Sequence, residues 1–239
     1  MTPAERIRGN VEAVRARIRK AAERAGRDPA AVRLLAITKS AGPEALAHLA
    51  AAGVREIGEN RVQEAERKAG AASAAGLSLH LVGRLQRNKA RRAARLFDSF
   101  HALDSIRIAE ALDVSLGEAD RSLPVFVEVN VSGEASKGGV PPAEISSLLG
   151  ALARFGRLRP AGLMTMAPYA EDPEAARPVF SALRRLSESL AGRPPFEGGR
   201  PLLSMGMSGD FEAAILEGAD VVRIGSALFA GATDLPAPQ

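Results

Sequence analysis

The sequence predicts an α/β fold, a single (β/α)8 TIM barrel preceded by one extra helix. Short apolar segments alternate with amphipathic ones along the 239 residues, and no change of composition divides the chain. The apolar segments number eight, which is the strand count of this barrel. A doubly wound open sheet is the alternative, because weak strands are difficult to count. The eightfold count favours the barrel, as one domain over residues 1–239.

The extra helix is predicted within residues 1–26. Apolar residues recur there at steps of four, three and four, between arginine and glutamate residues. They are Ile7, Val11, Val14 and Ile18. This spacing places all four on one face of a helix. We expect that face to pack on the outside of the barrel.

The eight predicted strands are rich in β-branched and other apolar side chains, which is typical of strands buried on both faces. We expect them at residues 32–38, 54–58, 79–83, 97–103, 124–131, 158–166, 202–206 and 220–225. The clearest is the fifth, where valine recurs at every second position from Val125 to Val131.

The segments between the strands show helical periodicity or begin with residues that start helices, such as Pro43 and Asp172. We expect helices at residues 44–52, 59–68, 85–96, 106–116, 141–152, 172–190 and 208–216. A small-residue loop is expected at 70–76. Beyond the eighth strand we expect only a short tail, residues 231–239, and no second domain.

Composition narrows the class of protein. The chain has no cysteine, which excludes disulfides, thiolate nucleophiles and thiolate metal sites and fits a reducing compartment. The N-terminus lacks the apolar core of a signal peptide, and no apolar run is long enough to span a bilayer. We therefore expect a cytoplasmic protein without a membrane partner.

The charge balance argues against nucleic acid as a partner. The net charge is +4 and the pI about 9.9, but arginine, which stays protonated far into alkali, dominates the basic residues. Aromatic residues, which stack on bases, make up only 4% of the chain. The three histidines, His48, His80 and His101, lack metal-ligand spacing, so no metal site is predicted.

Lys39 follows directly on the first predicted strand. At that position we expect an amine held against apolar walls, and a buried amine loses affinity for its proton. The neutral form is the one that condenses with an aldehyde. The alternative is a lysine whose head group extends into solvent at the barrel mouth. Lysine is scarce in this arginine-rich chain, which favours a specific role.

Two glycine-containing loops follow the seventh and eighth predicted strands, where barrels commonly bind phosphate. They contain Ser208 in the first loop and Gly225 and Ser226 in the second. Glycine permits close approach of the backbone, and Ser208 is expected to cap its helix and direct N–H groups at an anion. The alternative is that these residues only form tight turns.

Arg223 lies among apolar residues of the eighth predicted strand, so we expect a buried guanidinium that needs an acceptor. A carboxylate in an ion pair and a ligand atom are both open. An arginine facing the nitrogen of a pyridine ring would donate a hydrogen bond without protonating it, which leaves a weak electron sink. Asn60 is expected at the mouth of the second strand, near Lys39, as a ligand contact or a helix cap.

Six blocks of the sequence, in order, resemble the pyridoxal-phosphate homeostasis protein family. This family is similar to the barrel domain of bacterial alanine racemase standing alone. The blocks are residues 35–39, 58–64, 80–89, 162–166, 203–211 and 222–226. Together they extend the resemblance over nearly the whole chain.

The resemblance implies a covalent aldimine between Lys39 and pyridoxal 5′-phosphate, with Arg223 facing the pyridine nitrogen. The remaining cofactor contacts that it implies are Ser208, Gly225 and Ser226 at the phosphate, and Asn60 and Met207 along the cofactor. It also implies a protein that buffers or delivers the cofactor and has no established turnover. Other B6 vitamers and apo-enzymes that use the cofactor are the implied partners, and we expect a monomer.

Two enzymatic alternatives stay open. One is a pyridoxal-phosphate enzyme acting on amino acids, such as a racemase, and two-base racemisation needs a second acid or base on the face of the cofactor opposite the lysine. The only tyrosine is Tyr169, after the sixth strand, which keeps this alternative alive. A Schiff-base aldolase acting on sugar phosphates would use the same lysine and phosphate loops. Lys89 and Lys137 are candidates for a second landing place of a phosphorylated vitamer.

Overall fold

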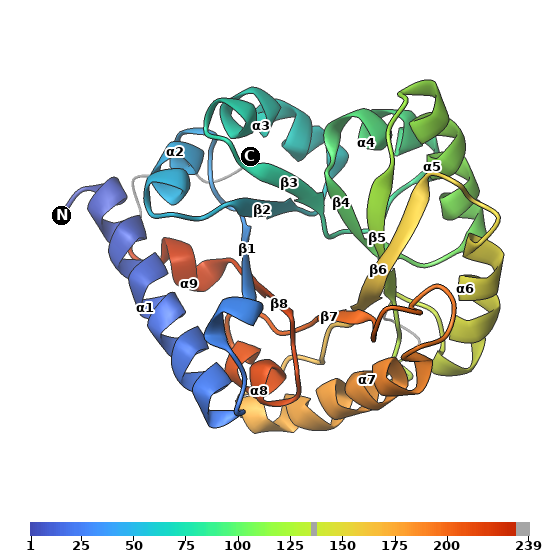
Figure 1. Ribbon diagram of the computed structural model, residues 1–239. Helices are drawn as coiled ribbons and strands as arrows, with labels where there is room; N and C mark the ends of the chain where they lie inside the picture. Colours follow the sequence, from blue (N-terminus) through green and yellow to red (C-terminus); the bar gives the residue numbers. More distant parts are fainter. Residues whose placement is uncertain (135–137, 233–239) are drawn as a thin grey trace.

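The computed structural model describes residues 1–134 and 138–232, and its eight strands close into a parallel barrel in the order β1 to β8. Figure 1 looks into this barrel, with the helices arranged around it. The strands are β1 (Arg33–Ile37), β2 (Glu56–Glu59), β3 (Ser78–Leu81), β4 (Ser99–Leu103), β5 (Leu123–Glu128), β6 (Leu158–Met164), β7 (Leu202–Ser204) and β8 (Val221–Ile224). The pairing of β1 with β8 closes the barrel and confirms the predicted fold class.

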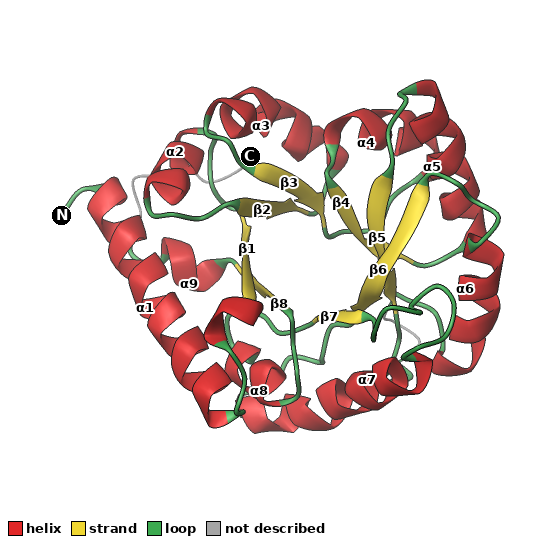
Figure 2. Ribbon diagram, viewed as in Figure 1, coloured by secondary structure: helices red, strands yellow, loops and turns green. Residues whose placement is uncertain are grey.

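Helices follow the strands and cover the outside of the barrel, as Figure 2 shows in red. They are α1 (Pro3–Arg24), α2 (Glu44–Ala51), α3 (Val62–Ala74), α4 (Ala90–Leu96), α5 (Ile106–Glu118), α6 (Ile145–Leu152), α7 (Arg177–Leu190), α8 (Phe211–Leu216) and α9 (Ser226–Phe229). Short 3-10 turns are η1 (Pro29–Ala31), η2 (Arg87–Lys89), η3 (Pro142–Glu144) and η4 (Pro173–Ala176).

The N-terminal helix α1 has the position that its sequence predicts. Its first turn is closed by a capping box, in which the Glu5 backbone N–H donates to Thr2 Oγ1 and the Thr2 backbone N–H donates to Glu5 Oε2. The predicted apolar face is buried. It packs against α2, α8 and α9, on the outer side of the barrel (Figure 1).

Several predicted boundaries were wrong. Residues 70–74, expected in a loop, continue α3, because the alanines there favour a helix and Ala72 is buried. Strand β5 ends at Glu128 rather than at residue 131, because the Asn130 backbone N–H donates to the Val140 carbonyl of the returning loop. Helix α8 begins at Phe211, three residues later than expected, and α9 was not predicted.

The described helices include none that combines the length and the apolar character needed to cross a membrane.

Candidate functional site

A cavity of about 500 Å³ opens at the carboxyl ends of the strands, among the loops that follow β1, β6, β7 and β8. This end of a barrel is where function gathers, because the loops there vary without disturbing the strands. Six of the seven predicted site residues line the cavity: Lys39, Met207, Ser208, Arg223, Gly225 and Ser226. The fold thus brings together groups up to 187 residues apart in the chain, from Lys39 to Ser226.

Lys39 lies in the turn that follows β1, and its side chain is exposed. The expectation of an amine held against apolar walls was therefore wrong. Strand β1 ends at Ile37, so the buried stretch stops before the lysine, and the turn carries the lysine out to the cavity rim. The open alternative, a head group that reaches solvent at the barrel mouth, matches this position.

Arg223 on β8 is only 4% exposed, as its apolar neighbours predict. Its guanidinium donates to Ser204 Oγ and to the Thr165 carbonyl, each at 2.9 Å. Neither partner is charged, so within the described residues the arginine forms no ion pair. Burial lowers the pKa of Arg223 to about 10, against the opposing attraction of Asp210 and Glu128. The arginine remains a cation at neutral pH and cannot readily give up its proton.

Ser208 joins the two predicted phosphate loops. Its Oγ accepts from the backbone N–H groups of Gly225 and Ala227, at 3.2 and 3.3 Å. The prediction that it caps its own helix was wrong, because α8 begins further on, at Phe211. A serine hydroxyl also donates one hydrogen bond, and none of the described residues accepts it. That proton is available to a ligand in the cavity.

Glycines allow the backbones around the cavity to approach closely. Gly206, two residues after the end of β7, has φ +90°, and a Cβ there would lie 2.9 Å from Phe211 Cα and 2.6 Å from Ala214 Cβ. At Gly225 a Cβ would lie 3.3 Å from the Ile37 carbonyl oxygen. A larger residue at Gly206 would displace its loop, whereas one at Gly225 would require the Ile37 backbone to shift by a few tenths of an ångström.

Asn60 is the predicted site residue that does not line this cavity. It directly follows β2, and the helix cap of α3 is Arg61, so Asn60 does not cap that helix. Asn60 instead lines a second hollow together with Arg84 and Lys89. Lys137, the other candidate for a second landing place, lies outside the described residues.

A chain of buried polar groups leads from Arg223 across the barrel interior. Ser204 Oγ lies 2.9 Å from His101 Nδ1, and His101 Nε2 lies 3.1 Å from His80 Nδ1. The ring of His101 also stacks on Phe126, with 4.2 Å between centroids. Burial lowers the pKa of His80 to about 4 and that of His101 well below its ordinary value. Both rings are therefore neutral. Neutral rings do not repel the Arg223 guanidinium at the other end of this series of hydrogen bonds.

The cavity also holds an exposed phenol and two carboxylates. Tyr169 is 95% exposed. Asp172 Oδ1 accepts from the Glu174 backbone N–H at 3.0 Å, and Asp210 Oδ1 accepts from the Met207 backbone N–H at 2.5 Å. Burial raises the pKa of Asp210, against the opposing effect of that backbone N–H. Both carboxylates thus help to shape their own loops.

One buried cluster beside the site was not predicted. Lys68 on α3 contacts Glu59 and Thr38, and all three are buried. A signal was present in the sequence, because Lys68 falls on the buried face of its helix with Val62 and Ala65. A lysine on an apolar face requires a buried partner.

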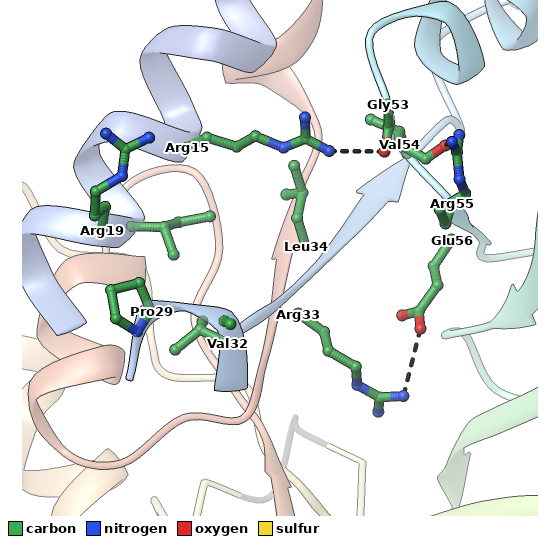
Figure 3. Close-up of a pocket in the computed structure, with 12 residues that line it drawn as sticks. Arg15, Arg19, Pro29, Val32, Arg33, Leu34, Gly53, Val54, Arg55 and Glu56 are labelled. Atoms are coloured by element: carbon green, nitrogen blue, oxygen red, sulfur yellow. Dashed lines mark hydrogen bonds and ion pairs between the residues drawn. The ribbon is translucent and has the colours of Figure 1, made fainter. Parts of the chain in front are cut away.

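Another hollow, of about 380 Å³, lies at the opposite end of the barrel, between α1 and the starts of β1 and β2. Figure 3 shows the arginines around it. Arg15 donates to the Ala52 and Gly53 carbonyls, and Arg33 Nη1 lies 3.4 Å from Glu56 Oε1. Arg15 thus completes the end of α2, and Arg33 pairs with a carboxylate on the neighbouring strand β2, so both guanidinium groups have partners within the protein.

The chain resembles known proteins over nearly its whole length. The family model of the alanine racemase N-terminal domain matches residues 9–233. The pyridoxal phosphate homeostasis protein of Pseudomonas aeruginosa is 43% identical over 232 residues, 97% of this chain and 98% of that protein.

Solved structures are also similar to this chain over nearly its whole length. A Bifidobacterium adolescentis protein of unknown function superposes with a TM-score of 0.86 at 37% identity, covering 95% of each chain. PipY of Synechococcus elongatus, solved with PLP bound, has a TM-score of 0.80 at 32% identity and covers 94% of this chain and 100% of its own.

Proposed function

The chain belongs to the alanine racemase N-terminal domain family and, within it, to the pyridoxal phosphate homeostasis proteins, and we propose that it binds pyridoxal 5′-phosphate and buffers or delivers it. The observation that carries this proposal is the cavity at the carboxyl ends of the strands. It combines an amine, a buried guanidinium and a hydroxyl-rich pair of loops: Lys39, Arg223, and the loops of Ser208 and Ser226.

The cavity fits the three functional parts of this cofactor. Its volume of about 500 Å³ is typical of small-molecule sites. We assign the phosphate to the loops after β7 and β8, where the Ser208 proton has no acceptor among the described residues and Gly225 keeps the backbone accessible. We assign the pyridine nitrogen to Arg223. Asn60 and Met207 remain proposed contacts, Met207 from the cavity wall.

When bound, the cofactor supplies an electrophilic aldehyde that a primary amine can capture. We propose that Lys39 Nζ forms a C=N bond to the aldehyde carbon, while the carbonyl oxygen leaves as water. Water or another amine reverses this step. The exposure of Lys39 supports such reversibility, because it leaves the linkage open to solvent and to an acceptor. A protein that lends its cofactor needs this property more than a protein that keeps it.

The electrostatics of the cavity favour a carrier over a catalyst. Arg223 holds its proton, so it stabilises the pyridine nitrogen in its unprotonated form, a weak electron sink. The carboxylates of Asp172 and Asp210 are engaged by backbone N–H groups. We therefore propose that the protein binds and releases the cofactor without turnover of amino acids.

An amino-acid racemase or another pyridoxal-phosphate enzyme is the second candidate, because Tyr169 does line the cavity. Incubating the loaded protein with a panel of L-amino acids tests it. Racemisation, transamination or decarboxylation that depends on Tyr169 would establish this alternative, and unchanged amino acids would remove it.

Titration with pyridoxal 5′-phosphate tests the main proposal. The wild-type protein should develop the absorbance of a Schiff base, become labelled by borohydride, and pass the cofactor to an added apo-enzyme. Lys39→Ala should do none of these, whereas Lys20→Ala, which removes an exposed lysine of α1, should behave as wild type. A colourless wild-type protein that takes up no cofactor would contradict the proposal.

We further propose that the chain acts as a single domain and as a monomer in the cytoplasm. Other B6 vitamers with a phosphate would share the loops after β7 and β8, and apo-enzymes would receive the cofactor. The open cavity mouth, with Tyr169 and Lys39 both exposed, supports transfer at this surface.

A further inference from the structure

Lys68 is the one buried lysine among the described residues, only 3% exposed, whereas the other lysines in that part of the chain are exposed or partly exposed. Its Nζ lies 2.6 Å from Glu59 Oε1 and 2.6 Å from the Thr38 carbonyl oxygen. Removing an ammonium group from water is costly even when it is paired. The Lys68–Glu59 pair is therefore not explained by a gain in stability, so we consider what its position holds in place.

The Thr38 carbonyl is the acceptor at the start of the turn that carries Lys39. It also accepts from the Ala41 backbone N–H at 3.0 Å, which closes the turn over Lys39 and Ser40. Both of these turn residues are exposed, so apolar burial does not hold them. The Lys68 ammonium thus binds the one carbonyl that fixes where this turn leaves the barrel.

Glu59 fixes Lys68 in turn. It is fully buried at the end of β2, and its Oε1 accepts from the Thr38 hydroxyl at 2.5 Å as well as from Lys68. The Thr38 backbone N–H donates to the Gly58 carbonyl at 3.0 Å. Residue 38 is therefore held through its N–H, its hydroxyl and its carbonyl.

We propose that Lys68, held by Glu59, is a positioning residue that orients the turn so that Lys39 meets the aldehyde of a ligand whose phosphate is bound at β7 and β8. The inference rests on the proposed function. Capture of a bound aldehyde is effectively intramolecular, so its rate depends steeply on placement of the amine. Affinity for the phosphate depends on loops on the other side of the cavity. The ion pair therefore governs capture and not phosphate binding.

The test compares the double variant Lys68→Met/Glu59→Gln with wild type. Both charges disappear together, so no lone buried charge remains, and the introduced amide can still accept the Thr38 hydroxyl. The matched control is Lys20→Met/Glu23→Gln, which makes the same changes at exposed positions of α1. Pyridoxine 5′-phosphate, which has an alcohol in place of the aldehyde, measures binding without capture. Borohydride trapping of pyridoxal 5′-phosphate on the Lys39 peptide measures capture.

We expect the double variant to bind pyridoxine 5′-phosphate within about twofold of wild type and to be labelled at Lys39 on the order of tenfold more slowly. In the ligand-free protein, the Ala41 amide should exchange hydrogen faster relative to amides of β5. The control should match wild type in all three measurements.

A folded double variant that is labelled at the wild-type rate would overturn the inference. Losses of binding and capture in equal proportion would also overturn it, because they indicate a merely structural role. If wild type itself takes up no cofactor, the proposed function fails, and Ala41 exchange then decides separately whether the ion pair holds the turn.

Discussion

At the amino ends of the strands Asp220 accepts from Arg27, Arg200 and the Leu203 backbone N–H. At the carboxyl ends, the partners of Arg223 among the described residues are only a serine hydroxyl and a carbonyl. The first set is a carboxylate surrounded by charged donors. The second is a buried cation with neutral partners. Asp220 directly precedes β8 and Arg223 lies within it, three residues further along the chain.

The difference separates stability from binding. At the amino ends, arginines donate to carboxylates and to carbonyls at the ends of helices, as Arg15 in Figure 3 illustrates. At the carboxyl ends, Arg223 and Ser208 keep electrostatic or donor capacity that the described protein groups do not use. We therefore expect substitutions at the two ends to change different observables.

The largest effect on folding is expected from Asp220→Ala. It removes the carboxylate that pairs with Arg27 and Arg200, which keep only carbonyl acceptors, and it leaves the buried Leu203 backbone N–H without its acceptor, so the free energy of unfolding should fall by about 3–5 kcal/mol. Cofactor affinity of the folded protein should stay within about twofold. Denaturant unfolding and cofactor titration measure the two quantities.

Glu118→Ala provides the control, because it breaks an exposed ion pair with Arg91 and should change stability by less than about 1 kcal/mol. Loss of cofactor affinity in folded Asp220→Ala would erase the distinction between the two ends.

The buried histidines His80 and His101, in the barrel interior between its two ends, predict that stability depends on pH. Folded His80, with its pKa lowered to about 4, stays neutral while the unfolded chain binds a proton near pH 6.5. Stability is therefore full above pH 6.5 and decreases as the pH falls towards 4, by about 3 kcal/mol from this group.

Urea unfolding at several pH values should show this slope in wild type and a smaller slope in His80→Gln. His48→Gln, on the outer helix α2, should keep the wild-type slope. An unchanged slope in His80→Gln would show that this ring is not held neutral.

A smaller and opposite pattern is expected for Ser208→Ala. Loss of one donor to a charged phosphate should weaken cofactor binding about tenfold. Stability should fall by only about 1 kcal/mol, because Gly225 and Ala227 lose a single partly buried acceptor. Ser189→Ala, on α7, should change neither quantity. Unchanged affinity in Ser208→Ala would exclude it as a phosphate ligand.

The smallest effect is expected for Tyr169→Phe. The phenol is 95% exposed, so neither stability nor cofactor uptake should change measurably. Reduced uptake would show that the tyrosine closes over the cavity and belongs to the binding residues.

The barrel fold and the position of the site at the carboxyl ends of its strands could both be predicted from the sequence. Strand periodicity predicts the eight strands, and the rule that loops after parallel strands meet at one edge places Lys39, Ser208 and Arg223 at the same end of the barrel. These inferences need only local patterns and one topological rule. They were confirmed where they concerned the fold and the shared cavity.

Within the site, the errors concern where individual side chains point. A strand pattern does not tell whether the strand ends one or two residues before Lys39, nor whether the turn that follows carries its amine out to solvent. Likewise, Ser208 bonds to residues 17 and 19 positions further along the chain, which no local capping rule contains. The contact between Lys68 and Thr38 spans 30 positions and was missed for the same reason.

The most direct test of the central claim is to reduce the loaded protein with borohydride and map the labelled peptide by mass spectrometry. We expect a single pyridoxyl group on Lys39 in the wild-type protein, and in Ser208→Ala a lower occupancy of the same lysine. Labelling of another lysine with Lys39 unmodified, or no labelled peptide at saturating cofactor, would contradict it.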